Sequence, residues 1–135
     1  MAVGNDRNLF HEKLDVLAPC ALGGVLGPET IPNLRCRIVC GTANNQLVDP
    51  VRDGRALKAR GVCYAPDFVA NAGGLIRLAG LHLGMTEARI DEKVAGIEQT
   101  TAEVLREADS APSTAEAAIE FARRRIESAP TPASA

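Results

Sequence analysis

Three short apolar runs, each followed by a loop rich in proline, glycine or asparagine, most constrain how this chain can fold. The runs cover residues 14–18, 35–40 and 62–65. Apolar runs of this length between turn residues are typical of buried β-strands. The stretches between them, one with a helical pattern at residues 29–34, are long enough for the crossover connections that parallel strands need. We therefore expect an α/β fold built around a parallel sheet.

The connection before the third run carries a clearer helical pattern. A short helix is expected over residues 53–60, because apolar positions recur there and Gly61 supplies a C-terminal stop. We expect Ala56, Leu57 and Ala59 to face inward from this helix.

The chain changes character after Gly74, where helical patterns replace the β-type runs. Residues 75–81 can start a helix. Thr86 is a suitable N-cap for a long amphipathic helix that ends near Ala108. We expect these two helices to follow one another.

A last helix is indicated by the capping-box spacing from Ser113 to Glu116. The proline-punctuated segment after it, residues 129–135, is expected to be disordered. The side chains that we expect this helix to bury are Ala118, Ile119, Ala122 and Ile126. The aromatic residues that we expect in the core are Tyr64, Phe68 and Phe121.

The charge balance argues against nucleic acid as a partner. The 135 residues include 15 Lys and Arg against 17 Asp and Glu, a formal net charge of -2, whereas nucleic-acid binding needs a basic patch. No apolar stretch reaches the roughly 20 residues that span a bilayer, and the first residues lack the pattern of a signal peptide. We expect a cytoplasmic protein of one domain, with no nucleic-acid or membrane partner.

The four cysteines are expected to be free thiols, because disulfides are rare in the cytoplasm. Cys36, Cys40 and Cys63 lie in the apolar runs, where a thiol acts as a small hydrophobic side chain. Cys36 and Cys40 are separated by a three-residue spacer with no histidine nearby, so they complete no zinc set. We expect no metal site.

Each predicted strand runs into a loop, named here the first loop (residues 19–24), the second loop (41–46) and the third loop (65–74). Ligands of open parallel sheets bind beyond the carboxyl ends of the strands. The three loops are therefore expected to converge on one crevice. Ordinary turns would have the same composition, so composition alone leaves both interpretations open.

Three sequence blocks carry a more specific signal. They are DVLAPCALGG at residues 15–24, GTANNQL at 41–47 and YAPDFVANAGGLI at 64–76. In order and spacing they resemble the glutamate/leucine/phenylalanine/valine dehydrogenase family, and more closely its leucine, valine and phenylalanine branch. The resemblance implies the second half of a Rossmann-like NAD-binding domain, followed by C-terminal α-helices.

Members of this family oxidatively deaminate an L-amino acid to the 2-oxo acid and ammonia, and pass the α-hydride to NAD. The resemblance therefore implies NAD as cofactor and an apolar L-amino acid, or its 2-oxo acid, as substrate. Hydride transfer needs cofactor and substrate in contact and correctly oriented, which rigid loops can provide. The expected organisation is a connecting segment at 1–13, a partial nucleotide-binding domain at 14–84, C-terminal helices at 85–128 and a disordered tail at 129–135.

The resemblance also implies roles for individual residues on the cofactor side. Ala18, Pro19 and Cys20 would line the nicotinamide side of the crevice through backbone and small side chains. Asn44 would hydrogen-bond the nicotinamide ribose. A plain turn role for Asn44 stays open, because asparagine is a common turn former.

On the substrate side, the resemblance places Asn71 beside the substrate carboxylate, helped by the backbone amides of a turn at Gly73 and Gly74. Leu75 and Leu78, one helical turn apart, would line an apolar side-chain pocket. A turn role for Asn71 and a core role for the two leucines stay open.

Two elements of the family pattern are not found in this sequence. One is the Gly-x-Gly-x-x-Gly turn that seats the pyrophosphate, and the other is the pair of catalytic lysine and aspartate. Lys13, Lys58 and Lys93 do not match the catalytic motif. We expect the C-terminal part of an amino-acid dehydrogenase, with no catalytic residue of its own and inactive alone.

The alternative is a non-enzymatic binding or assembly module that complements a separately encoded N-terminal piece. A half sheet would leave an edge strand and an apolar face uncovered, and such surfaces favour pairing. We therefore expect either a homo-oligomer or a complex with that N-terminal piece.

Overall fold

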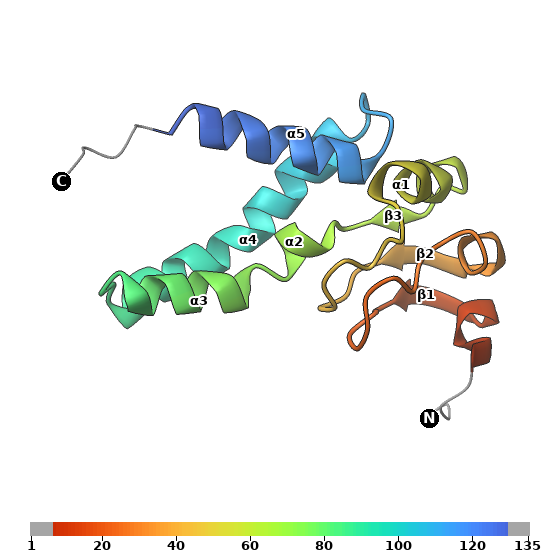
Figure 1. Ribbon diagram of the computed structural model, residues 1–135, viewed down its shortest axis with the longest axis horizontal. Coiled ribbons are helices and arrows are strands. Elements are labelled where there is room, and N and C mark those ends of the chain that lie inside the picture. The colour runs from red at the N-terminus through yellow and green to blue at the C-terminus, as the bar shows by residue number, and fades with distance from the viewer. Residues whose placement is uncertain (1–6, 130–135) are drawn as a thin grey trace.

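The computed structural model describes residues 7–129. A parallel sheet of three strands, in the order β1-β2-β3, lies at one end of the described structure (Figure 1). This confirms the α/β fold. Residues 1–6 of the predicted connecting segment and residues 130–135 of the predicted tail lie outside the described residues. The strands are β1 (Lys13–Leu17), β2 (Arg35–Val39) and β3 (Cys63–Tyr64).

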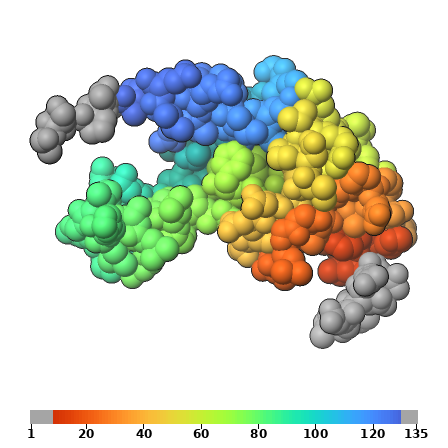
Figure 2. Space-filling view, viewed as in Figure 1, coloured from red at the N-terminus to blue at the C-terminus, as the bar shows by residue number. Residues whose placement is uncertain are grey.

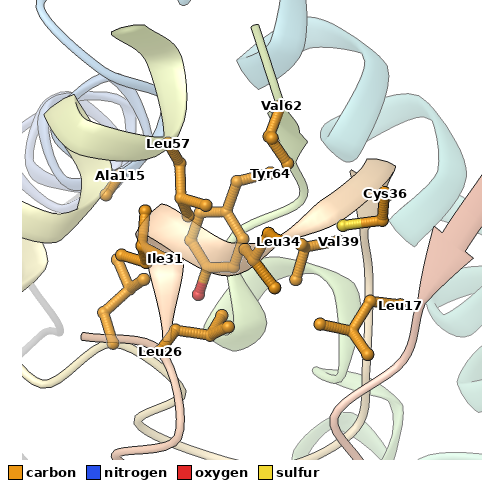
Figure 3. Close-up of a cluster of buried hydrophobic side chains, with 11 residues drawn as sticks. Leu17, Leu26, Ile31, Leu34, Cys36, Val39, Leu57, Val62, Tyr64 and Ala115 are labelled. Atoms are coloured by element: carbon orange, nitrogen blue, oxygen red, sulfur yellow. The ribbon is translucent and has the colours of Figure 1, made fainter. Parts of the chain in front are cut away.

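The register places equivalent residues of the strands side by side. Leu17 pairs with Val39, and Val39 pairs with Tyr64. All three are buried and belong to the main core (Figure 3). Leu57, from the connection between β2 and β3, packs in the same cluster. Because neighbouring side chains of a strand point to opposite faces, this row defines one covered face of the sheet.

The connection between β1 and β2 contributes less helix than its pattern predicted. Residues 29–34 form only the short 3-10 helix η2 (Ile31–Asn33). The connections also pair with each other through an isolated parallel bridge from Leu26 to Leu47. Both leucines are buried in the main core, so this connection is fixed by packing rather than by regular structure. A further 3-10 helix, η1 (Arg7–His11), precedes β1.

Helix α1 (Pro50–Ala59) begins three residues before the predicted start. The side chain of Asp49 caps it by accepting hydrogen bonds from the backbone N–H groups of Val51 and Arg52, and proline suits the first helical position. Leu57 is buried as expected, but Ala59 is exposed, which corrects the predicted inward face. Gly61 follows the helix with a φ of 69°, as its stop role predicts.

Between β3 and residue 129, four helices form an extended layer beside the sheet (Figure 1). Thr86 and Ser113 cap the third and fourth of them, as predicted, by accepting hydrogen bonds from the N–H groups of Arg89 and Glu116. Ala118 packs with Val69 and Val104 in a second, smaller core cluster. The helices are α2 (Asp67–Ala70), α3 (Gly73–His82), α4 (Glu87–Glu107) and α5 (Thr114–Glu127).

The predicted inward face of the last helix was partly wrong. Ile119 is 41% exposed and Ile126 is 74% exposed. The residues that α5 does bury are alanines near its start, because its first turns pack against α1 and β3 while its second half extends beyond the sheet (Figure 1). Phe68, expected in the core, is 47% exposed, whereas Tyr64 is buried and Phe121 is half-buried against the smaller cluster.

Two of the three cysteines expected to act as small core side chains are exposed. Cys36 is buried, and burial raises the pKa of its thiol. Cys40 follows the end of β2, and Cys63 pairs with Ile38 on the sheet face opposite to Val39 and Tyr64. Both thiols therefore reach solvent. Within residues 7–129, no helix combines the length and apolar character needed to cross a membrane.

Candidate functional site

The first two loops lie against each other at the carboxyl ends of β1 and β2. The N–H of Ala43 donates to the carbonyl oxygen of Pro19 at 2.9 Å. A Cβ at Gly41 would collide with the same oxygen, far inside van der Waals contact. Only glycine allows this approach, so the two loops are held in one fixed relation.

The third loop joins them through two asparagine side chains. Asn71 donates from Nδ2 to Oδ1 of Asn44 at 2.7 Å and to the carbonyl oxygen of Thr42 at 3.2 Å. Asn71 is also the C-cap residue directly after α2. The carboxyl ends of β2 and β3 thus bring together the two asparagines that the sequence assigned to cofactor and to substrate.

The predicted nicotinamide-side residues lie at the same edge. Cys20 is exposed, and a hydrogen bond from the Thr42 side chain holds the pKa of its thiol below the usual value. Ala18 is exposed and Pro19 is half-buried. Because Ala43 bonds to Pro19 and Asn71 bonds to Thr42 and Asn44, the three loops share one surface.

Two buried polar residues beneath this surface were not predicted. Gln46 is fully buried, and its Nε2 donates to the carbonyl oxygens of Gly41 and Ala43, both at 2.9 Å. Its backbone N–H donates to Oδ2 of Asp67 at 3.0 Å. The one local signal was that Asp67 follows a proline at a helix start, where an acidic residue is favoured.

The substrate-side residues after Asn71 lie in a helix rather than a turn. Gly73 and Gly74 are the first two residues of α3, which corrects the predicted turn. Leu75 is 73% exposed and Leu78 is 70% exposed. Neither leucine belongs to the core of the described residues, so the core alternative is wrong. Both side chains are free to form one wall of a pocket whose other wall comes from another surface.

A separate hollow of about 560 Å³ lies between α4 and α5, and Figure 2 shows the space between α3 and α5. Phe68, Ile97 and Ile126 line it, with Lys93 and Arg125 beside them. It contains none of the residues that the sequence assigned to cofactor or substrate. The asparagine cluster is therefore the candidate functional site.

Comparison with known proteins identifies the setting of this cluster. The glutamate/leucine/phenylalanine/valine dehydrogenase family model matches residues 2–82, more than half of the chain. The chain belongs to this dehydrogenase family. The matched segment contains all three loops, and so includes both asparagines of the candidate site.

Individual dehydrogenases match most of the chain. The phenylalanine dehydrogenase of Caldalkalibacillus thermarum is 42% identical over 121 residues, which is 89% of this chain and 32% of that protein. The valine dehydrogenase of Streptomyces albus is 45% identical over 123 residues, 90% of this chain and 33% of that protein. The chain therefore spans about a third of the length of these curated dehydrogenases.

A solved structure has the same arrangement of elements. The L-tryptophan dehydrogenase from Nostoc punctiforme matches with a TM-score of 0.85 and 35% identity, over 91% of this chain and 38% of that one. This supports the Rossmann-like character of the sheet and extends the match into the C-terminal helices.

Proposed function

We propose that this chain supplies the nicotinamide-side loops and part of the amino-acid site of an NAD-dependent L-amino-acid dehydrogenase. The substrate would be an apolar L-amino acid, which is deaminated oxidatively to the 2-oxo acid and ammonia. The observation that carries the proposal is the 2.7 Å hydrogen bond between Asn71 and Asn44. It joins the residue expected to meet the substrate to the residue expected to meet the cofactor.

The atoms at this cluster suit the nicotinamide half of the cofactor. Asn44 uses Oδ1 for Asn71, and its Nδ2 has no hydrogen-bond partner within residues 7–129. The free amide can therefore donate to a ribose hydroxyl without adding charge beside the reacting atoms. NAD, when bound, would supply the acceptor for the α-hydride, and the exposed first loop at Cys20 would border its ring.

Asn71 could bind a substrate carboxylate by exchanging one contact. Both of its N–H groups are engaged, but the bond to the Thr42 carbonyl is the longer, at 3.2 Å. A carboxylate is a stronger acceptor than a neutral carbonyl, so it would replace Thr42 while the bond to Asn44 remains. Leu75 and Leu78 would then face the apolar side chain of the substrate.

Within residues 7–129, no lysine lies at the asparagine cluster to act as a general base, and Lys13, at the start of β1, lies at the opposite end of the sheet. Lys58 is engaged by carbonyl oxygens of Ala108 and Ala111, and Lys93 lies on α4, away from the asparagine cluster. A positioned base commonly contributes roughly 100- to 10,000-fold to the rate. We therefore expect no robust NADH formation when the purified chain is assayed with NAD and L-phenylalanine, L-leucine or L-valine.

The proposal is tested by supplying the rest of the fold. The chain would be fused after the preceding part of the Caldalkalibacillus thermarum phenylalanine dehydrogenase, in place of its matching segment. The expected result is NADH formation from apolar L-amino acids, at a rate that depends on Asn44 and Asn71. A folded chimera that binds no NAD, or that deaminates none of these amino acids, would overturn it.

A specific observation favours the second candidate function, an assembly module that complements an N-terminal piece. On the sheet face opposite to Val39 and Tyr64, Val16 is 49% exposed and Ile38 is 40% exposed, and Cys63 continues the same row, whereas Leu14 and Cys36 at the start of the strands pack with the main core. Parallel sheets are normally covered on both faces. In the described part of the chain, the outer edge of β1 also pairs with no other strand.

Sedimentation distinguishes the forms of this second candidate. Self-association that Ile38→Lys abolishes would support a homo-oligomer through the open face. A 1:1 complex with the N-terminal piece, without NADH formation, would support a purely structural module. A stable, well-folded monomer that does not bind the N-terminal piece would contradict both the homo-oligomer and the structural module.

A further inference from the structure

The candidate site rests on two buried polar residues from different segments. Gln46 is fully buried and Asp67 is 9% exposed. The Asp67 carboxylate accepts from the N–H of Gln46 through Oδ2, at 3.0 Å, and from the N–H of Phe68 through Oδ1, at 2.7 Å. One carboxylate therefore ties the second loop to the first turn of α2.

Each asparagine of the site is attached to one side of this contact. Asn44 lies two residues before Gln46, in a loop whose carbonyl groups at Gly41 and Ala43 are held by Gln46 Nε2. Asn71 lies one helical turn after Asp67, and its N–H donates to the Asp67 carbonyl at 2.8 Å. The contact between Gln46 and Asp67 thus links the two segments that carry the asparagines.

Stability alone does not account for this arrangement. Oε1 of Gln46 is buried and has no hydrogen-bond partner within the described residues. A buried acceptor without a hydrogen bond lowers the stability of the folded state. An apolar side chain at position 46 would avoid this loss of stability. What Gln46 provides instead is two directed bonds that fix the path of the second loop.

We propose that Gln46 and Asp67 are positioning residues, which hold the amide groups of Asn44 and Asn71 at the distance needed for substrate and cofactor to meet. This inference rests on the proposed dehydrogenase function, and it assigns neither residue a contact with the reacting atoms. Its structural part concerns only the geometry of the two asparagines and can be measured without catalysis.

The first test uses Asp67→Asn in the full chain, with Asp91→Asn on the exposed surface of α4 as the matched control. The two N–H groups are bound by different oxygens of the carboxylate, and an amide would replace one of these oxygens with a donor NH2 group. In the unaltered chain, NMR should detect a nuclear Overhauser contact between the side-chain amide protons of Asn71 and the side chain of Asn44. Asp67→Asn should abolish this contact, and the control should keep it.

A second variant covers the case in which Asp67→Asn does not fold. Gln46→Met removes the directed bonds and the unpartnered oxygen while keeping a side chain of similar size. We expect it to fold and to lose the same NMR contact. In the chimeric dehydrogenase it should lower kcat/KM by about tenfold to a hundredfold, as small misplacements of substrate groups do.

Folded variants that keep the contact between Asn44 and Asn71 would overturn the positioning inference. An unaltered chimera that fails to deaminate amino acids would overturn the proposed function instead, while the NMR result on the chain alone would still stand. The two failures are therefore distinguishable.

Discussion

The side chain of Asn71 donates a 2.7 Å hydrogen bond to the side-chain oxygen of Asn44, which lies 27 residues earlier in the chain. The two residues follow different strands, β3 and β2, and meet because parallel strands end at the same edge of the sheet. This contact gives the cluster a defined donor and acceptor arrangement. It also means that a change at one asparagine alters the other.

In the chimeric dehydrogenase, Asn71→Ala should cost about 1.5–3 kcal/mol of transition-state binding, the usual range for a hydrogen bond to a charged group. The measurement is kcat/KM for an apolar L-amino acid. Asn33→Ala is the control, because that exposed side chain donates a hydrogen bond to the carbonyl of Glu29, away from the asparagine cluster. An unchanged kcat/KM for Asn71→Ala would contradict the proposal that Asn71 binds the substrate carboxylate.

Gly80→Ala should destabilise the chain by about 1–3 kcal/mol, since extra carbon in a packed contact forces neighbours to move. Gly80 on α3 packs against Ile90 on α4, and a Cβ at Gly80 would lie 2.6 Å from Cγ1 of Ile90. Gly96→Ala on α4 is the matched control, because a Cβ at Gly96 would have no neighbouring atom within 4 Å outside its own helix backbone. Gly96→Ala should raise the free energy of unfolding by about 0.5–1 kcal/mol, because alanine has the higher helix propensity. The measurement is urea unfolding, and equal changes for the two variants would contradict a tight contact between Gly80 and Ile90.

Lys58→Met should lower the free energy of unfolding by about 1 kcal/mol, the usual net contribution of a hydrogen bond. Its ammonium donates to the carbonyl oxygens of Ala108 at 2.6 Å and Ala111 at 2.5 Å, and so satisfies groups that the end of α4 leaves without partners. Lys93→Met, on the exposed surface of α4, serves as the control. A loss in both variants of the same size would show that charge alone, and not the cap, is responsible.

Asp53→Asn should destabilise the chain by about 1.5–3 kcal/mol at neutral pH. The buried Asp53 carboxylate accepts from Arg52 at 2.7 and 2.9 Å and from the N–H of Asp49 at 2.8 Å. The hydrogen bond from Arg52 holds the pKa of Asp53 below its usual value.

The lowered pKa of Asp53 fixes the sign of the pH dependence. Its contribution is fully present above the unfolded-state pKa of about 3.9 and is lost as the pH falls through the lower folded-state pKa. The difference in unfolding free energy between the unaltered chain and Asp53→Asn should therefore be constant near neutral pH and shrink below about pH 4. A difference that grows in acid would contradict the ion pair.

Local patterns in the sequence determined the elements and their order. The caps at Thr86 and Ser113 and the stop at Gly61 were predictable, because each depends on neighbouring backbone groups or on a single φ angle. The convergence of the three loops was predictable as well, since it follows from parallel strands. The sequence blocks also determined the family, because they do not depend on the contact between Asn44 and Asn71.

Only the tertiary structure decided which side chains are covered and which polar groups are buried. Ile126 has the spacing of a core residue, yet it is exposed because α5 extends past the elements that would cover it. Gln46 and Asp67 look like ordinary loop and helix-start residues, but they are buried because segments 21 residues apart close over them. Burial depends on contacts between distant segments, which no local pattern records.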